Sequence, residues 1–417
     1  MKICIVGLGY VGLPAACVLA QAGHTVVGVD VRSDVVAGLN KGRVHIDEPG
    51  ISDLLHEALE QKRFTAQAQP EPADAFILCV PTPFKDGYQP DLGYVEAATL
   101  SVLPVLKEGD LVVVESTIPV GATEKVAALI RTSRPELTQE ALHVAHCPER
   151  VLPGNAIREI IYNDRVIGGT TPEATDRAAR LYRSFSRGTV AETTANTAEL
   201  AKLAENTFRD INIAYANELS MLCNECGVDT QELIRLANMH PRVNIHSPGA
   251  GVGGHCIPVD PWFIVSRFPR EATLIRAARE VNIQKETWVV DQVLQAARLH
   301  GVKQVVMAGL TYKPDVDDFR ESPALRISEQ VAARLSQPLI GVDPYAAKLL
   351  QERQVGFALQ SEIPRQASTL VAVLVRHRQF GAALSEIETV GGAVLMDFCR
   401  GSGQPQLMAD QPVELVP

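Results

Sequence analysis

The first 200 residues alternate between short apolar runs and longer segments with helical periodicity. Apolar runs at residues 2–6 and 25–29 predict buried strands, and the segment 13–21 between them predicts a helix. Further buried strands are predicted at residues 75–80, 111–115 and 143–145. Buried strands that alternate with helices are typical of a doubly wound α/β sheet with mainly parallel strands.

A purely helical segment follows. Asn196, with Glu199 three residues later, has the pattern of a helix N-terminus. Apolar residues then recur at helical spacing to about Cys226, where Gly227 can end the helix. This pattern predicts one long helix without intervening strands.

The same helix carries a polar stripe. Lys202, Asn206 and Arg209 follow an i, i+4, i+7 spacing, which places them on one face. Such a stripe is usually solvated surface, but asparagine is unfavourable inside a helix, so the stripe indicates a shared polar task.

The last third of the chain returns to strands, at residues 302–309, 339–343 and 370–375. The segment 339–343 repeats the pattern of 26–30, including the final aspartate. This part lacks a G-x-G-x-x-G motif, and its best-placed cations are Lys313 and Arg320. We expect it to bind a simpler phosphate-bearing ligand, or none.

Charge and cysteine content narrow the class of protein. The 417 residues include 39 basic and 49 acidic ones, and the net charge of −10 argues against a nucleic-acid partner. Eight scattered cysteines do not form a disulfide pattern.

Residues 3–29 lack charged side chains and resemble an export signal, but three glycines interrupt the apolar run. With no other stretch apolar enough to span a membrane, we expect a cytoplasmic protein.

A glycine motif joins the first predicted strand to its helix. Gly7 permits a tight turn, Gly9 lets the backbone approach a pyrophosphate, and Gly12 lets the helix pack closely on the strand. Asp30 follows Gly12 by 18 residues, where a carboxylate accepts hydrogen bonds from ribose hydroxyls and repels the 2′-phosphate of NADP. The ordered set predicts NAD binding.

Other candidate residues follow the ends of predicted strands, where ligands of open parallel sheets collect. Thr82 and Thr117 are candidate cofactor contacts, and capping of the next helix is the alternative for each. Glu149 and Arg150, in the segment 147–154, place a carboxylate and a guanidinium at the same edge.

A loop rich in glycine and proline follows the central helix. In it Cys256 lies among glycines beside His255, with Asp260 four residues on. This thiol is either a nucleophile, if a nearby cation favours the thiolate, or a small buried hydrophobe. Cys223 and Cys226 imitate zinc-finger spacing with two later histidines, but both lie in a periodic helix, so no metal site is predicted.

Together these motifs resemble the UDP-glucose/GDP-mannose dehydrogenase family over nearly the whole chain. The resemblance rests on residues 7–12, Ser116-Thr117, Pro148-Glu149, Lys202 with Asn206, the Gly-Gly-His-Cys-Ile-Pro-x-Asp segment 253–260, and Lys313 with Arg320-Glu321-Ser322. More narrowly, the segments 147–154, 208–214 and 240–244 are similar to those of bacterial UDP-N-acetyl-D-mannosamine dehydrogenases.

The resemblance implies oxidation of a UDP-sugar at C6, from alcohol to carboxylate, by two NAD⁺ in turn and without release of aldehyde. Cys256 would hold the aldehyde as a thiohemiacetal and then form a thioester that water cleaves. Lys202, with Asn206 on its helix, would stabilise oxyanions at C6. Asp260 and Glu149 would handle the proton or the water, and the sequence does not divide these tasks. The narrower resemblance implies UDP-N-acetyl-D-mannosamine as substrate and a product used in cell-surface polysaccharides such as enterobacterial common antigen.

Binding residues and domains follow from the same resemblance. The cofactor set is Gly7, Gly9, Tyr10, Val11, Gly12, Asp30, Thr82, Thr117 and, for a cofactor phosphate, Arg320. The substrate set is Arg150, Val151, Lys202, Asn206, Arg209, His240, Arg242, Gly251, Tyr312 and Lys313, whose cations suit a pyrophosphate. The domains are an NAD-binding Rossmann domain (1–193), an all-helical central domain that forms a homodimer (194–296), and a UDP-sugar-binding Rossmann-like domain (297–417).

Alternatives concern both substrate and reaction. Gly254 and His255 depart from common UDP-glucose members, so the hexose is not inferred from them; UDP-N-acetylglucosamine, UDP-glucose and GDP-mannose stay open. A single-step β-hydroxyacid dehydrogenase also pairs a dinucleotide fold with Lys and Asn four apart on a helix, but it needs neither Cys256 nor a third domain. A non-catalytic nucleotide-sugar sensor is the remaining alternative.

Overall fold

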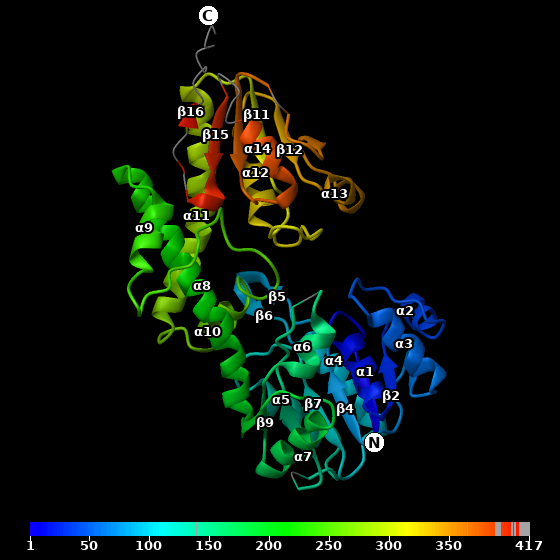
Figure 1. The fold of residues 1–417 in the computed structure, drawn as a ribbon. Coiled ribbons are helices and arrows are strands. Elements are labelled where there is room, and N and C mark those ends of the chain that lie inside the picture. The colour runs from blue at the N-terminus through cyan, green and yellow to red at the C-terminus, as the bar shows by residue number, and fades with distance from the viewer. Residues whose placement is uncertain are drawn as a thin grey trace, which may run out of the picture. The chain divides into compact units, whose positions relative to one another are not determined.

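The computed structural model describes residues 1–138, 140–152, 154–364, 366–387, 393–401, 403 and 406–407. The chain forms two compact units (Figure 1). The first comprises residues 1–205 and 262–269, and the second comprises residues 206–261 and 270–417. No helix in the described part of the chain is long and apolar enough to cross a membrane.

An eight-stranded sheet forms the centre of the first unit, in the order β10-β9-β8-β7-β4-β1-β2-β3. Neighbouring strands are parallel except for β8 and β9, which are antiparallel. The strands are β1 (Lys2–Val6), β2 (Thr25–Val29), β3 (Phe64–Gln67), β4 (Ala75–Leu78), β7 (Leu111–Val114), β8 (His143–His146), β9 (Arg165–Gly169) and β10 (Val190–Thr194). A small hairpin, β5 (Phe84–Lys85) with β6 (Gln89–Pro90), lies outside this sheet.

Helices cover both faces of this sheet because alternate residues of each strand point to opposite sides. Ile3 and Ile5 of β1 pack in one core cluster, whereas Cys4 and Val6 pack in another. The first cluster includes residues of α1 (Gly12–Gln21), α3 (Ile51–Glu60), α6 (Ala156–Tyr162) and α7 (Pro172–Arg183). The second includes residues of α4 (Gly93–Val102) and α5 (Ala122–Ser133). The short α2 (Ser33–Leu39) follows β2.

Four helices follow β10 with no strand between them: α8 (Ala195–Cys226), α9 (Thr230–Ala237), α10 (Asp260–Arg267) and α11 (Thr273–Leu299). The long predicted helix is therefore confirmed, and Gly227 follows it with a left-handed φ of +69°. The predicted capping pair is wrong. Thr194 caps the helix through its hydroxyl to Thr197 N at 3.3 Å, and Glu199 accepts hydrogen bonds from Gly121 and Thr123 at the start of α5.

The second unit holds a six-stranded sheet in the order β13-β12-β11-β14-β15-β16, in which only β15 and β16 pair antiparallel. Its strands are β11 (Gln304–Ala308), β12 (Leu339–Val342), β13 (Ala358–Gln360), β14 (Thr369–Val373), β15 (Val394–Asp397) and β16 (Gln406–Leu407). The helices α11, α12 (Pro323–Arg334) and α13 (Ala346–Glu352) contribute to the core on one face, and α14 (Gly381–Ile387) contributes to the other. The predicted class, two Rossmann-like sheets with an all-helical segment between them in sequence, is confirmed.

The two sheets share one local frame, which we call the strand–aspartate frame. After β1, Gly7 has a φ of +96° and Leu8 N donates to Asp30 Oδ2 at 3.1 Å. After β11, Gly309 has a φ of +84° and Leu310 N donates to Asp343 Oδ2 at 2.7 Å. The echo between residues 26–30 and 339–343 is therefore confirmed as a repeated backbone arrangement.

Candidate functional site

The turn after β1 forms a glycine cradle of the kind that holds a dinucleotide. A Cβ on Gly7 would lie 2.4 Å from Cys79 O, and one on Gly12 would lie 1.9 Å from Gly7 O, so neither position accepts a side chain. A Cβ on Gly9, by contrast, has no neighbour within 4 Å. The space beside Gly9 lets a pyrophosphate approach the backbone, which is the fit that NAD requires.

Helix α1 begins at this cradle with its N-terminus open. Its N-terminal neighbour Val11 makes no side-chain cap, and the first turn has no acidic residue. Tyr10 is 42% exposed beside it. The positive end of the helix dipole can therefore face an anion.

Asp30 lies at the end of β2 with its carboxylate oriented by backbone. Oδ2 accepts from Leu8 N at 3.1 Å, and Oδ1 accepts from Arg32 N at 2.9 Å. Asp30 is partly exposed, so its oxygens can accept further hydrogen bonds from a ribose diol.

Thr82 and Thr117 follow β4 and β7, two strands that pair side by side, and both are partly exposed. Between them Ser116 ties the two strand ends together: its hydroxyl accepts from Val80 N at 2.9 Å and donates to Val80 O at 2.7 Å. The structure thus brings both threonines to the edge of the sheet that carries the glycine cradle.

Glu149 lies beyond β8 in a buried charged cluster. Its Oε1 accepts from Arg150 N at 2.6 Å, and its Oε2 lies 3.5 Å from Arg165, whose side chain is 4% exposed. Glu115 lies deeper, where it accepts from Cys79 at 3.0 Å and from Tyr182 at 2.7 Å. Burial, and next the charge of Glu149, raise the pKa of Glu115.

Arg150 is held at the same edge by Glu205, with 2.6 Å between Nη2 and Oε1. Val151 is half-buried beside it, and Pro153 of the predicted motif lies outside the described residues. The carboxylate and the guanidinium are therefore neighbours, as the sequence predicts, although each has its own partner.

Lys202 projects from α8 and is 8% exposed. It lies near His146, at the end of β8: burial lowers the pKa of His146 to about 4, and the positive charge of Lys202 adds to this lowering. His146 uses one ring nitrogen, Nδ1, to contact Val114 O at 2.7 Å. Lys202 is thus a largely buried cation at the carboxyl edge of the first sheet.

Cys256 belongs to the second unit, in a glycine-rich loop pressed against the start of α12. A Cβ on Gly251 would lie 2.7 Å from Pro323, and one on Gly253 would lie 2.6 Å from the same ring. Gly254, with a φ of +89°, packs against the Tyr312 ring. These close approaches leave Cys256 exposed beside the loop that carries Tyr312.

Asp260 lies just after this thiol in the chain. Its N–H donates to Cys256 O at 2.9 Å, and its Oδ2 accepts from Asn206 Nδ2 at 2.6 Å. Asp260 is 2% exposed and Asn206 is 8% exposed. The asparagine that is unfavourable for a helix is therefore the partner of a buried carboxylate.

His255 and Arg320 converge on Asp318. The His255 ring lies 3.7 Å from Asp318, and Arg320 Nη2 lies 2.7 Å from it. Burial raises the pKa of Asp318, but the contacts with His255 and Arg320 outweigh burial and hold that pKa well below its usual range. Tyr312 N also donates to Asp318 O at 3.1 Å, which joins the Tyr312–Lys313 turn to this cluster.

Arg209, His240 and Arg242 are exposed in the second unit, and Gly251 is half-buried. Asn238 closes the loop of His240 and Arg242, because it donates to Ile245 O at 3.0 Å and accepts from Ile245 N at 2.7 Å. Arg242 N donates to His240 Nδ1 at 3.3 Å within this loop. All three side chains lie on the surface of the unit.

The predicted site residues thus fall on both units. The first carries Gly7, Gly9, Tyr10, Val11, Gly12, Asp30, Thr82, Thr117, Glu149, Arg150, Val151 and Lys202. The second carries Asn206, Arg209, His240, Arg242, Gly251, Cys256, Asp260, Tyr312, Lys313 and Arg320. In the described part of the chain, no group of His, Cys, Asp or Glu side chains could hold a metal ion.

Family models match nearly the whole length. The NAD binding domain of the UDP-glucose/GDP-mannose dehydrogenase family matches residues 1–186, its central domain matches 196–284, and its UDP binding domain matches 306–400. The chain belongs to this family. It is accordingly an NAD-dependent dehydrogenase of nucleotide sugars, and the UDP binding domain agrees with a UDP-sugar as substrate.

Individual relatives cover more than nine-tenths of both chains. The chain is 50% identical over 385 residues to an NDP-N-acetyl-D-galactosaminuronic acid dehydrogenase of Ralstonia nicotianae, covering 91% of each chain. It is 46% identical over 395 residues to the UDP-N-acetyl-D-mannosamine dehydrogenase of Escherichia coli, covering 91% of this chain and 94% of that one. The solved UDP-D-ManNAc dehydrogenase of Pyrococcus horikoshii matches with a TM-score of 0.85 at 36% identity, covering 100% and 98%.

A buried polar seam between α8 and α11 is not predicted by the sequence. Asp210 accepts from Arg279 at 2.6 Å and from Asn282 at 2.8 Å, and Asn282 in turn accepts from Asn217 at 2.9 Å. Asn217 Oδ1 also accepts from Gly249 N at 2.9 Å, so the seam reaches the loop that carries Cys256. In the sequence, polar residues within a helix favour a solvated face and do not indicate a buried seam.

Proposed function

We propose that this enzyme oxidises C6 of UDP-N-acetyl-D-mannosamine to give UDP-N-acetyl-D-mannosaminuronate. The overall change converts a primary alcohol to a carboxylate, consumes two NAD⁺ and one water, and forms two NADH with release of three protons. We further propose that the intermediate aldehyde stays bound to Cys256 throughout, and that the uronate serves cell-surface polysaccharide synthesis.

One observation carries this proposal: an exposed cysteine on a glycine loop that packs against the Tyr312 turn. Nucleophilic thiols need access, whereas structural thiols are buried. Cys4, Cys17 and Cys147 are buried, and burial raises the pKa of each to about 12. Cys256 differs from them in exposure and in its neighbours Asp260 and His255.

Each covalent step then has a residue to perform it. Bound NAD⁺ supplies the hydride acceptor in both oxidations. The Cys256 thiolate adds to the C6 aldehyde, forming a C–S bond, and the carbonyl oxygen becomes an oxyanion that takes a proton to give the thiohemiacetal. Loss of hydride from C6 and of the hydroxyl proton leaves a thioester. Water attacks its carbonyl and gives up its two protons, first to a carboxylate acting as base and then to solvent. The C–S bond breaks to return the thiolate and release the carboxylate.

The charged side chains fit these steps. In the proposal Lys202 stabilises the oxyanions at C6, because a mostly buried cation acts strongly on developing negative charge. Asp260, oriented by Asn206, and Glu149, oriented by Arg165, take the proton or position the water. We assign the two tasks to the pair and not to either carboxylate alone.

Binding roles are proposed for the remaining candidates. Gly7, Gly9, Tyr10, Val11, Gly12, Asp30, Thr82 and Thr117 hold NAD, and Arg320 reaches a cofactor phosphate. Arg150, Val151, Arg209, His240, Arg242, Gly251, Tyr312 and Lys313 hold the UDP-sugar, together with Lys202 and Asn206. The corresponding domains are 1–193, 194–296 and 297–417.

A second substrate has a specific observation in its favour. The Ralstonia relative at 50% identity is named for N-acetyl-D-galactosaminuronic acid, whereas relatives at 46–47% are named for N-acetyl-D-mannosamine. Both sugars carry a 2-acetamido group, so we place UDP-N-acetylhexosamines ahead of UDP-glucose and GDP-mannose.

The test is a substrate panel followed at 340 nm with NAD⁺. It contains UDP-N-acetylmannosamine, UDP-N-acetylgalactosamine, UDP-N-acetylglucosamine, UDP-glucose and GDP-mannose. The proposal expects the first to give the highest kcat/KM, with two NADH per sugar. A yield of one NADH would contradict the four-electron reaction, and a preference for UDP-glucose would overturn the substrate assignment.

Cys256→Ala tests the covalent route. We expect this variant to stall after the first oxidation, while Cys226→Ala, which removes the other exposed thiol, keeps full turnover. Normal conversion of the alcohol to the carboxylate by Cys256→Ala would contradict the covalent mechanism.

We also propose a homodimer through the central helices. Phe208, Tyr215 and Leu222 recur every seven residues on α8 and are 64%, 51% and 58% exposed. A row of large apolar side chains left in water on one helix is typical of an interface with another copy.

A further inference from the structure

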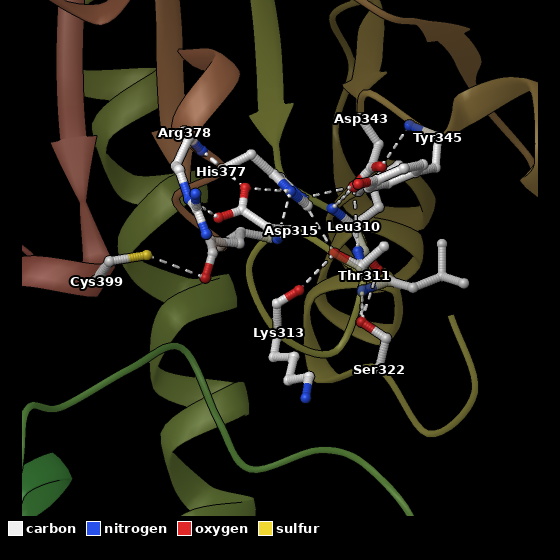
Figure 2. Close-up of polar contacts among 12 residues, drawn as sticks. Leu310, Thr311, Lys313, Asp315, Ser322, Asp343, Tyr345, His377, Arg378 and Cys399 are labelled. Carbon is white, nitrogen blue, oxygen red and sulfur yellow. Dashed lines mark hydrogen bonds and ion pairs between the residues drawn. The ribbon is translucent and has the colours of Figure 1, made fainter. Parts of the chain in front are cut away.

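A buried histidine in the second unit contacts the turn that carries Tyr312 and Lys313 at two points, and it also contacts the aspartate that follows β12 (Figure 2). His377 follows β14, and its side chain is 1% exposed. Its Nδ1 lies 3.0 Å from Asp315 N, and its Nε2 lies 3.0 Å from Thr311 Oγ1 and 3.2 Å from Asp343 Oδ2.

These contacts fix which ring nitrogen carries the proton. A backbone N–H can only donate, so Nδ1 accepts from Asp315 and has no hydrogen. Nε2 therefore bears the hydrogen and donates toward Asp343 and Thr311. Thr311 Oγ1 in turn lies 3.0 Å from Lys313 O and donates to it. His377 thus joins the final aspartate of the strand–aspartate frame to both sides of the turn.

The turn needs such support because its backbone is strained. Asp315 has a φ of +59°, a left-handed conformation that a side chain disfavours. Its N–H is held by His377, and its carboxylate accepts from Arg378 N at 3.0 Å and from Arg378 Nε at 2.8 Å. Two consecutive residues after β14 therefore hold Asp315 in place.

The anchor uses backbone and hydroxyl groups of the turn and leaves the Lys313 side chain out of it. Thr311, Lys313 and Asp315 contribute a hydroxyl, a carbonyl and an N–H to the anchor. In Figure 2 the side chain of Lys313 points away from His377, and its Nζ lies 5.5 Å from the centre of the Tyr312 ring. His377 thus fixes backbone atoms of the turn, while the Lys313 side chain is partly exposed and points away from the histidine.

We propose that His377 is a positioning residue for the UDP-sugar: it holds the Thr311–Asp315 turn in the strained conformation that presents Tyr312 and Lys313 to the nucleoside diphosphate. This inference rests on the proposed function, which assigns those two residues to the substrate. It assigns no chemical step to His377, so its loss weakens binding of UDP more than it slows turnover.

Three variants of the full-length enzyme separate the contacts. His377→Leu removes all of them. His377→Asn can place an oxygen near the Nδ1 position and keep the Asp315 contact, whereas His377→Gln can reach the Nε2 position and keep the contacts with Asp343 and Thr311. Val371→Ala is the control, because it removes buried methyl groups from β14 without touching the turn.

The first readout is the Kd of UDP alone, measured by titration calorimetry. We expect His377→Leu to raise this Kd about tenfold, as the loss of two ordinary hydrogen bonds would, and His377→Asn and His377→Gln to raise it less. Val371→Ala should lower the melting temperature and leave the Kd within about twofold. The KM for UDP-sugar should rise in parallel, with kcat and the KM for NAD⁺ little changed.

The second readout needs no ligand. Amide exchange of the segment 311–318 should be slow in the wild type and faster in His377→Leu, because the Asp315 N–H loses its acceptor. Unchanged exchange and unchanged UDP affinity in His377→Leu would overturn the inference, as would equal weakening by Val371→Ala. The proposed function fails instead if the wild-type enzyme reduces no NAD⁺ with any UDP-sugar, a result that leaves the exchange comparison intact.

Discussion

Gly253→Ala is expected to impair catalysis through a single methyl group. A Cβ at this position would lie 2.6 Å from Pro323 Cδ, 2.7 Å from Glu321 O and 3.1 Å from Tyr312 Cβ. Carbon atoms pack at about 3.5–4.0 Å, so the loop must move by roughly 1 Å to admit the methyl group. Pro323 and the Glu321 carbonyl are backbone or ring atoms that cannot swing aside.

The displacement reaches Cys256 three residues later. A 1 Å shift of a reacting group can lower the rate about 100-fold, and overpacking costs about 1–3 kcal/mol of folding stability. We therefore expect kcat to fall by roughly 10- to 100-fold, measured as NADH formation at 340 nm, with a lower melting temperature in calorimetry.

Gly249→Ala is the matched control in the same loop. Its Cβ would meet only Gly251 O, at 3.6 Å, which is an ordinary contact, and its φ is not left-handed. The N–H that donates to Asn217 is kept. This variant should retain nearly full activity. Equal loss of kcat in both variants, or no loss in either, would refute the explanation that close contacts at Gly253 exclude a methyl group.

Three further predictions concern the cofactor, the buried lysine and the dimer. Asp30→Ala should raise the KM for NAD⁺ on the order of tenfold and improve the relative use of NADP⁺. In our proposal this variant removes the carboxylate that binds the ribose hydroxyls and repels a 2′-phosphate, so an unchanged preference for NAD⁺ over NADP⁺ would contradict it. Burial lowers the pKa of Lys285 to about 7, so above that pH the unfolded state holds one proton more and stability should rise with pH, by up to about 1.4 kcal/mol per unit between pH 7 and 9. Lys285→Met should abolish this slope in denaturant titrations, and a slope identical to wild type would exclude Lys285 as its source. Phe208→Asp should convert the proposed dimer into monomers in light scattering, and an unchanged mass would contradict an interface on that face of α8.

Features that depend on residues close together in the sequence could be predicted from it. Strands β1 and β2 have the predicted bounds, and Asp30 stands where the glycine motif requires it. Ser322 caps α12 by accepting from Leu325 N at 3.2 Å, and serine before proline is a local pattern typical of a helix start. Each of these features depends on residues within one turn or one strand–helix unit.

Contacts between distant segments were not predictable in the same way. Glu199 has the local pattern of a capping residue, yet its carboxylate accepts hydrogen bonds from Gly121 N and Thr123 N, some 76 positions away. The helical periodicity of α8 is real, but Leu200 and Phe208 on it are 41% and 64% exposed. Asp210, Asn217 and Ser220 are buried on α8 and pair with Arg279, Asn282 and Lys285 of α11. Pairing of this kind depends on the tertiary fold.

His377 illustrates the same limit within the second unit. Its partners come from segments that follow β11, which pairs with β14, and β12, which pairs with the other side of β11. Only the strand order of the sheet brings these segments together. Nothing near residue 377 in the sequence indicates that its ring supports residues 311–315.

The strand–aspartate frame also bears on how such a chain can be redesigned. Both copies keep the same glycine turn, the same leucine N–H and the same aspartate, yet Asp30 is partly exposed and Asp343 is fully buried. What differs is the segment inserted between the leucine and the next helix. The frame can therefore support loops of different sequence. We expect that residues 311–321 can be replaced by another ligand-binding loop, provided that the new loop buries the aspartate or leaves it exposed to accept hydrogen bonds from a ligand.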